Sequence, residues 1–443
     1  MKIRLSDHFT YRRLLRFVFP TVLMMIVTFV YGVVDGLFVS NLVGKNAFAA
    51  VNLIMPVLMA LGAFGFMIGT GGSALVSMTL GEGKKENAKK YFSMLVYLTV
   101  GVGMVVSVTG FIFMRQIALL LGASDLIIDD CVQYGRILIC SNAFFMLQNS
   151  FQSFLVTAER PQLGLTISVL AGLTNVFLDF LFMYVFHMGI AGAAVATAIS
   201  ETVGGIVPLI YFLGPNKSPL RLVRTTIEWK VIGRACANGS SEMLTNLSTS
   251  FVSILYNFQL MRIAAENGVA AYGVIMYVNF IFMGLFLGFS IGCGPVVGFH
   301  YGAGNKTELK SLLKKSLIMI GTIAIVLTTV AQLTAGKLAG IFVGYDVELL
   351  EMTRDGLRLY SFSFLLCGFN IFGSAFFTAL GNGGLSALIA ALRTLVIQVA
   401  AIMILPLIFG TNGIWLAIVV AEAGTLTVTI LLIWGNRKRY GYI

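Results

Sequence analysis

Charged residues are scarce in this sequence of 443 residues. Asp, Glu, Lys and Arg make up 11% of it, and apolar residues make up 58%. A soluble domain carries about 25% charged and about 45–50% apolar residues, so these charges cannot cover a water-facing surface of this size. The scarcity of charge excludes soluble two-domain enzymes, disordered chains and repeat architectures.

Cysteine, histidine and proline are also rare, at 5, 3 and 8 residues. The cysteines show no CxxC spacing and lie mostly in apolar runs, at residues 131, 140, 236, 293 and 367. This pattern favours small buried apolar side chains over a metal site or a disulfide framework, and it indicates no redox compartment. None of His8, His187 and His300 lies in an HExxH motif.

Apolar runs longer than 18 residues recur from end to end, which is the pattern of a helical membrane protein. We predict an all-α polytopic membrane protein with twelve transmembrane helices. The predicted spans are residues 14–41, 47–80, 91–114, 132–157, 163–187, 190–213, 235–262, 269–299, 311–335, 356–380, 385–409 and 412–434. The first run is a full span that we expect to remain as an anchor, and the longest loop is GPNKSPLRLVRTTIEWK at residues 214–230.

The positive charges predict the orientation of these spans. With both termini on one side of the membrane, that side holds 22 of the 30 Lys and Arg residues. Short loops rich in Lys and Arg face the cytoplasm. We therefore expect a multi-pass protein of the bacterial inner (plasma) membrane with both termini in the cytoplasm. The net charge of +11 reflects this topology and attraction to anionic lipid rather than contact with nucleic acid.

An internal repeat has an offset of 221 residues. GEGKKENAKK at 81–90 resembles GAGNKTELKS at 302–311, and FLVTAERP at 154–161 resembles FFTALGNG at 376–383. We predict two six-helix lobes related by a pseudo-twofold axis along the membrane normal. The predicted division is an N-lobe at 1–213, a cytoplasmic linker at 214–234, a C-lobe at 235–434 and a tail at 435–443. Facing repeats can enclose a cavity that opens alternately to either side, although duplication could also simply build a large bundle.

Five acidic residues lie inside predicted spans: Asp35, Asp179, Glu201, Glu242 and Glu422. A charge at the bilayer centre costs about 2.5–3.5 kcal/mol on insertion scales, so each acid should be neutral, paired or functional. At about 1.5 Å per residue, Asp35, Asn175, Asp179 and Thr197 converge in the outer half of the membrane. Their carboxylate, amide and hydroxyl oxygens suit Na⁺ or a shared proton. We favour binding of a coupling cation over a structural polar network.

The second half of the chain lacks this cluster. Residues 221 positions after Asp35, Asn175 and Asp179 are Tyr256, Val396 and Ala400. The scaffold therefore does not require the acids. Glu201 and Glu422 are repeat mates, and helix packing and ion movement explain them equally well.

Polar and aromatic helix faces predict a substrate cavity. Met and aromatic side chains adapt to lipophilic cations, although interhelical hydrogen bonding and core packing remain alternatives for the individual positions. The residues assigned to the cavity on this basis are Gln148, Gln152, Glu201, Glu242, Asn246, Tyr256, Met276, Phe280, Met283 and Asn370.

Over its whole length the chain resembles the multidrug and toxic compound extrusion (MATE) family, of the bacterial MepA-like kind. The motifs that carry the resemblance are Pro20 with Asp35, NLVGKNAFAA, LGEGKKENAKK, and NVFLDFLFMYVFHMGIAGAAVATAISE, which ends at Glu201. The resemblance implies a V-shaped pair of six-helix lobes that exports cationic, lipophilic drugs in exchange for Na⁺ or H⁺.

The resemblance also implies site residues. The family's cation site maps onto Asp35, Asn175, Asp179 and Thr197, with a backbone carbonyl near Ala193 as a further ligand. Asn149 matches another polar family position and is assigned to the cavity lining. NorM-like members also use carboxylates in the seventh and tenth spans, but here the tenth span has none.

We therefore predict a secondary active multidrug efflux antiporter that works by alternating access. It should be monomeric, with small organic cations as substrates, the lipid bilayer as its environment, no cofactor and no metal beyond a coupling Na⁺. An alternative is a flippase of lipid-linked oligosaccharide or lipid, which would need more basic residues in its cavity than Arg136 and Arg393. An intramembrane enzyme is a remote alternative, because no Ser–His–Asp arrangement lies within a span and GTGGS at 69–73 lies inside an apolar helix.

Overall fold

The computed structural model describes residues 3–344 and 346–442, and all of its regular secondary structure in these ranges is helical. Four short π-helical segments interrupt the α-helices: η1 (Val39–Val43), η2 (Ile68–Gly72), η3 (Phe180–Val185) and η4 (Leu392–Val396). The α-helices are α1 (Tyr11–Phe38), α2 (Lys45–Met67), α3 (Ser73–Gly81), α4 (Lys85–Leu120), α5 (Ile128–Thr157), α6 (Pro161–Asp179), α7 (Gly189–Leu213), α8 (Trp229–Gly302), α9 (Lys306–Val343), α10 (Val347–Ser361), α11 (Phe364–Ala379), α12 (Gly383–Ala391), α13 (Ile397–Phe409), α14 (Thr411–Gly435) and α15 (Arg437–Tyr440).

Nine helices in the described ranges are long and apolar enough to cross a membrane, and the bent pair α10–α11, with an angle of 47° between its members, makes a tenth. Two of the predicted spans lie within α8, which is broken at Ala265 by a non-helical backbone (φ 49°, ψ −145°). The predicted span at 132–157 coincides with α5, whose many polar residues keep it outside this apolar set. Each of the predicted spans thus corresponds to a helix or a helix segment.

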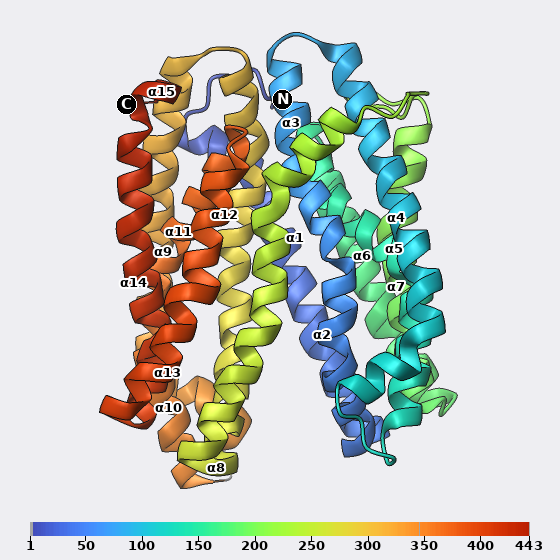
Figure 1. Ribbon diagram of the computed structural model, residues 1–443, viewed down its shortest axis with the longest axis vertical. Helices are drawn as coiled ribbons and strands as arrows, with labels where there is room; N and C mark the ends of the chain where they lie inside the picture. Colours follow the sequence, from blue (N-terminus) through green and yellow to red (C-terminus); the bar gives the residue numbers. More distant parts are fainter. Residues whose placement is uncertain (1–2, 345, 443) are drawn as a thin grey trace.

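The helices form two bundles that lie side by side (Figure 1). Helices α1 to α7 make one bundle, here called the N-lobe, and the helices from α8 onward make the other, the C-lobe. The two chain ends lie at the same end of the molecule, here called the terminal face, and the two bundles diverge toward the opposite end. The exact boundaries of the predicted lobes, linker and tail stay a prediction.

Glycine residues bring the backbones of the two lobes together near the terminal face. A Cβ atom on Gly81 would stand 2.0 Å from the carbonyl oxygen of Phe299, and one on Gly302 would stand 2.1 Å from that of Met78. Only glycine permits so close an approach between helices. The lobes are therefore tightly closed at the terminal face by this glycine seam.

Helix α1 also packs along the second part of α8. Glycines recur there every four residues, so one face of α8 has no side chains and α1 can lie directly against it. The contacts pair Gly284 with Phe29, Gly288 with Val22, and Gly292 with Val18. Helix α1 thus belongs to the N-lobe bundle and forms part of the interface between the lobes.

Candidate functional site

Two carboxyl groups face each other inside the N-lobe. Asp35 lies near the end of α1 and is 7% exposed, and Asp179 is the last residue of α6 and is fully buried. The two side chains interact directly with each other. The number of residues from the start of each span predicts that Asp35 and Asp179 lie at similar depths in the membrane, and the structure brings them together.

Asn175 and Thr197 complete this cluster. Asn175 lies one helical turn before Asp179, and its side-chain nitrogen donates a hydrogen bond to the Thr197 hydroxyl at 3.3 Å. Thr197 belongs to α7, and Ala193, one turn before it, is fully buried. Three helices therefore contribute to the predicted cation site.

Several oxygen atoms of this cluster have no hydrogen-bond partner within the described part of the chain. They are the Oδ1 atoms of Asp35 and Asn175 and both carboxyl oxygens of Asp179. Leaving a buried oxygen without a donor costs about 1–3 kcal/mol or more, so such groups call for an explanation. Protons on the carboxyls or a hard cation among these oxygens would satisfy them.

The local backbone supports the position of Asp179. Helix α6 begins with Pro161, which is favourable in the first turn because its missing N–H is not needed there. Directly after Asp179 the chain turns into the π-helical segment η3. Such segments often occur at functional sites because they displace side chains from the regular helical register.

A third carboxyl group lies nearby on α7. The Oε2 atom of Glu201 accepts a hydrogen bond from the Ser141 hydroxyl at 2.5 Å. Tyr134 of α5 is fully buried, its hydroxyl has no hydrogen-bond partner among the described residues, and it lies in electrostatic range of Asp35, Asp179 and Glu201. The acidic cluster therefore includes a phenol as well as three carboxyls.

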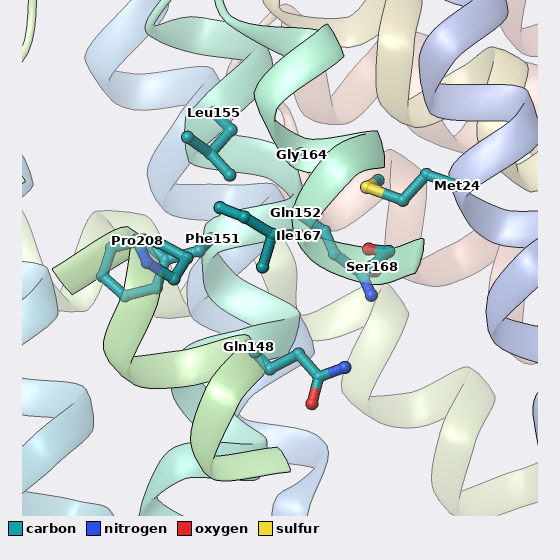
Figure 2. Close-up of a pocket in the computed structure, with 10 residues that line it drawn as sticks. Met24, Gln148, Phe151, Gln152, Leu155, Gly164, Ile167, Ser168 and Pro208 are labelled. Carbon is teal, nitrogen blue, oxygen red and sulfur yellow. The ribbon is translucent and has the colours of Figure 1, made fainter. Parts of the chain in front are cut away.

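A small cavity lies inside the N-lobe between α1, α5, α6 and α7 (Figure 2). The empty space among its lining side chains, part of it open to the outside, is about 240 Å³, and its polar lining consists of Gln148, Gln152 and Ser168. The side-chain nitrogen of Gln148 donates to the hydroxyl of Tyr31 at 3.5 Å, whereas its oxygen has no partner among the described residues. Sequence reasoning assigned both glutamines to a substrate cavity, and they lie together here instead of at the lobe interface.

A larger cavity lies between the two lobes, with about 500 Å³ of empty space that is partly open to the outside. Its one ionisable lining residue among those described is Glu242, on the first part of α8. Hydroxyl-bearing residues from both lobes line the same cavity: Thr70, Ser73, Ser153, Ser290 and Thr378. A single acid in an otherwise polar and apolar lining can attract an organic cation of irregular shape.

The C-lobe has a different interior. Glu422, the repeat mate of Glu201, forms an ion pair with Arg393 at 2.6 Å and accepts a hydrogen bond from Asn370 at 2.7 Å. Asn370 in turn accepts from Thr429 at 2.9 Å. Asn370 is therefore held within the C-lobe by its own hydrogen bonds and does not line either cavity.

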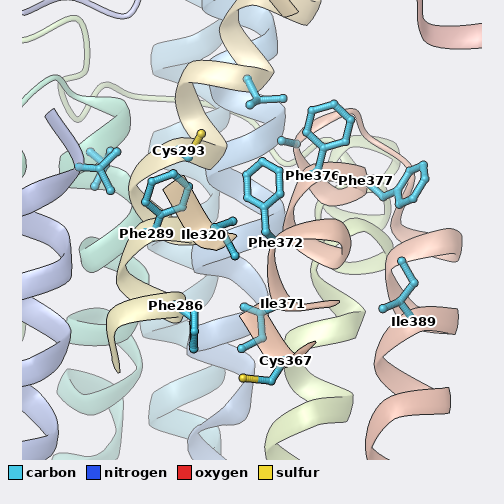
Figure 3. Packing of buried hydrophobic residues seen from close by; sticks show 14 of the residues in the cluster. Phe286, Phe289, Cys293, Ile320, Cys367, Ile371, Phe372, Phe376, Phe377 and Ile389 are labelled. Carbon is cyan, nitrogen blue, oxygen red and sulfur yellow. The ribbon is translucent and has the colours of Figure 1, made fainter. Parts of the chain in front are cut away.

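Apolar side chains fill much of the remaining C-lobe interior (Figure 3). Phe289 and Phe372 lie with their ring centres 6.1 Å apart, and both are almost completely buried. The ion pair thus lies in a lobe whose core is closely packed with aromatic rings.

The other residues assigned to the substrate cavity are dispersed. Asn149 donates to the backbone of Phe145, and Asn246 donates to the backbone oxygen of Glu242. Phe280 stacks on Phe29 of α1 across the lobe interface at 5.9 Å. The remaining residues lie in the C-lobe core or pack against it: Tyr256, Met276 and Met283.

Sequence reasoning missed the aromatic partners of the acids. Tyr31 lies four residues before Asp35 on α1, a spacing that places both on one helix face. Tyr134 and Ser141 are seven residues apart on α5, which also keeps them on one face. These spacings were present in the sequence, but nothing in it showed that the α5 face turns toward the acids of α1, α6 and α7.

The comparisons with known proteins agree with this architecture. The MatE family profile matches residues 20–181 and 243–404, one segment in each lobe. Multidrug export protein MepA of Staphylococcus haemolyticus strain JCSC1435 is 24% identical over 438 residues, which cover 97% of this chain and 94% of that protein. MepA of Staphylococcus aureus strain MSSA476 matches with the same identity and coverage.

Solved structures show the same fold. A crystal structure of MATE in complex with MaL6 has a TM-score of 0.91 at 24% identity and covers 98% of this chain and 97% of that one. An outward-facing multidrug resistance MATE family transporter also has a TM-score of 0.91, at 23% identity, covering 98% of this chain and 96% of that one. The predicted all-helical fold class and the family resemblance are both confirmed, and the chain belongs to the MatE family of multi-pass membrane transporters.

Proposed function

We propose that the protein is a secondary active antiporter that exports lipophilic, mostly cationic compounds in exchange for Na⁺ or H⁺. The observation that carries the proposal is the buried pair Asp35 and Asp179, whose carboxyl oxygens include three without a partner in the described ranges. The pair occurs in one lobe, and its repeat positions hold Tyr256 and Ala400. An acid pair of this kind is suited to bind and release a cation.

Helix α1 links this pair to the lobe interface. Asp35 lies on α1, and the same helix packs at Val22 against Gly288 of α8. Binding a cation between Asp35 and Asp179 removes the repulsion between two carboxylates, so α1 can repack. Pro20, inside α1, lacks the backbone N–H of an interior helix position and is a natural point for bending.

The cavity between the lobes is the proposed substrate site. Glu242 supplies the negative charge, and the surrounding hydroxyls and apolar side chains accommodate different cations. Repacking of α1 would separate the lobes at one face and close them at the other, which is alternating access. The membrane potential contributes about 2.3 kcal/mol per charge per 100 mV to such an exchange.

We also propose a location, an orientation and an oligomeric state for the protein. We place the protein in the bacterial inner membrane as a monomer, with the terminal face toward the cytoplasm because most Lys and Arg residues lie on that side. In this orientation the seam of Gly81 and Gly302 closes the cytoplasmic face, and the structure corresponds to the outward-open state. Export requires no covalent chemistry, so we propose no enzymatic activity and no cofactor.

Transport by purified protein in liposomes tests the proposal. A cationic dye is exchanged against an imposed Na⁺ gradient and, separately, against a pH gradient, which identifies the coupling ion. Asp35→Asn and Asp179→Asn should each abolish ion-driven exchange. Asp129→Asn is the matched control, because this carboxylate is exposed in the same lobe. Unchanged exchange in both pair variants would overturn the proposal.

A further inference from the structure

Four polar side chains share one face of α5 and are here called the stripe; Leu138 and Phe145 lie between them on the same face. Tyr134, Ser141, Gln148 and Gln152 are spaced by seven, seven and four residues, so they lie within about 40° of one another around the helix. The stripe is about 27 Å long, which approaches the thickness of the hydrocarbon core. It begins at the acidic cluster and ends near the terminal face.

Each member of the stripe lies near the acids or lines the cavity. Tyr134 lies in electrostatic range of the three carboxyls, and Ser141 is bonded to Glu201. Gln148 is bonded to Tyr31, which lies in electrostatic range of Glu201 and Asp35. The groups that face this path are thus acids and phenols from α1, α5, α6 and α7.

The cavity lies at the inner end of the stripe. Gln148, Gln152 and Ser168 line it together with Met24 (Figure 2). Gln148 is 7% exposed, and its side-chain oxygen has no hydrogen-bond partner among the described residues. The cavity lies near the chain turn after α5, where Glu159 accepts a hydrogen bond from the backbone of Leu5.

Three residues of the stripe and cavity have counterparts without a polar side chain in the C-lobe. Positions 221 residues after Gln148, Gln152 and Ser168 hold Phe369, Gly373 and Ile389. The stripe is therefore not a requirement of the helix packing, and it occurs in the same lobe as the acid pair.

We propose that this stripe and cavity form a water-lined proton path inside the N-lobe, leading from Asp35 and Asp179 toward the terminal face. The inference rests on the proposed antiport and specifies H⁺ as the coupling ion. A proton leaves a carboxyl of the pair, an O–H bond forms on Glu201, and the proton then passes to water in the cavity. Glu201 is then a carboxylate again, and the carboxylate left in the pair takes up the next proton from the opposite face of the molecule. The coupling proton thus bypasses the lobe interface, which the glycine seam closes.

Helix α1 is placed to control this path. It supplies Asp35 at one end and Met24 at the cavity, so one movement of α1 changes both. Leu155 and Met24 are apolar and lie at the cavity wall, where they can separate the water from the terminal face. The same helix would thereby prevent a continuous proton leak.

Hydroxyl-radical footprinting tests the water directly. Met24 is 1% exposed, and Met114 and Met146 are fully buried, so bulk solvent alone should oxidise all three slowly. Water in the cavity should make Met24 react at least about 10-fold faster than the other two. Equal rates at the three residues would overturn the proposal.

Filling the cavity tests its role in transport. Ser168→Leu should reduce pH-driven dye exchange about 10-fold, and equilibrium binding of the dye should stay unchanged. Thr166→Leu is the matched control, because this residue lies on the same helix with an exposed side chain. Thermal unfolding of both variants in detergent controls for misfolding, and Gln148→Leu serves as a second variant if Ser168→Leu does not fold.

The two proposals fail in different ways. Wild-type exchange by folded Ser168→Leu and Gln148→Leu, with Asp35→Asn inactive, would overturn the proton path and leave the antiport intact. Exchange driven by a Na⁺ gradient alone would also overturn the path. Full activity of Asp35→Asn and Asp179→Asn would instead overturn the antiport site itself.

Discussion

The surroundings of one pair of repeat-mate carboxyl groups differ between the two lobes. Glu422 of the C-lobe has an arginine at 2.6 Å and an amide at 2.7 Å, and it is fully buried. Glu201 of the N-lobe has one hydroxyl donor, from Ser141. The position 221 residues before Arg393 holds Gly172, so the N-lobe has no arginine there.

This difference indicates a structural role for Glu422 and supports the proposed transport role of the N-lobe acids. A buried ion pair with hydrogen bonds to its remaining oxygens needs no further cation. A buried acid without a cationic partner needs a proton or an ion from outside the protein. Glu422 in the C-lobe is therefore compensated by its own neighbours, and the proposed exchange of cations falls to acids that have no cationic partner.

Arg393→Met should have the largest effect of the variants that alter this comparison. It leaves Glu422 buried without its cation, and breaking one partner of a buried pair costs about 3–5 kcal/mol. Thermal unfolding in detergent should show a large loss of stability. The double variant Arg393→Met with Glu422→Gln should recover most of it, and a double variant as unstable as the single one would contradict this explanation.

Asp35→Asn and Asp179→Asn should reduce ion-driven exchange by about 100-fold or more, equivalent to about 2.7 kcal/mol. Their stability should change little or increase, because each removes a carboxyl that has unpartnered oxygens. The matched substitution in the other lobe is Tyr256→Phe, which should leave exchange near the wild-type rate. Dye exchange and thermal unfolding, measured on the same preparations, distinguish lost coupling from lost folding.

Asn370→Ala should destabilise the C-lobe by about 1–3 kcal/mol, because Glu422 and Thr429 both lose a buried hydrogen-bond partner. Its repeat mate Asn149 bonds to a backbone oxygen of its own helix, so Asn149→Ala should cost less. Thermal unfolding curves of the Asn370→Ala and Asn149→Ala variants measure this difference. Equal losses would show that the two lobes do not differ at this position.

Glu201→Gln should have the smallest effect on stability, within about 1 kcal/mol, because an amide can keep the bond to Ser141 and removes an uncompensated acid. Glu422→Gln should destabilise more, since it leaves Arg393 without its anion. A Glu201→Gln variant as unstable as Glu422→Gln would show that Glu201 also has a structural partner.

Much of the fold could be predicted from the apolar runs. Each predicted span coincides with a helix or helix segment because a membrane requires about 20 consecutive apolar residues in a helix. The break at Ala265 and the bend between α10 and α11 could not be predicted in this way. No proline marks them, and tertiary packing decides where an apolar helix turns.

The acid pair could be predicted, but its surroundings could not. Counting residues along each span places Asp35 and Asp179 at similar depths, because both helices begin at the same membrane surface. The pairing of Arg393 with Glu422 depends on the rotation of α14 against η4, which the sequence does not specify. The same limit explains why Asn370, assigned to a cavity, lies inside the C-lobe.

The glycine seam at the terminal face has a practical consequence for trapping conformations. At Gly81 and Gly302 a single methyl group would press against a backbone oxygen of the opposite lobe. Alanine at either position acts as a wedge that disfavours the state described here and favours the one open at the terminal face. Such variants offer a route to a ligand-free sample of the opposite conformation for structure determination.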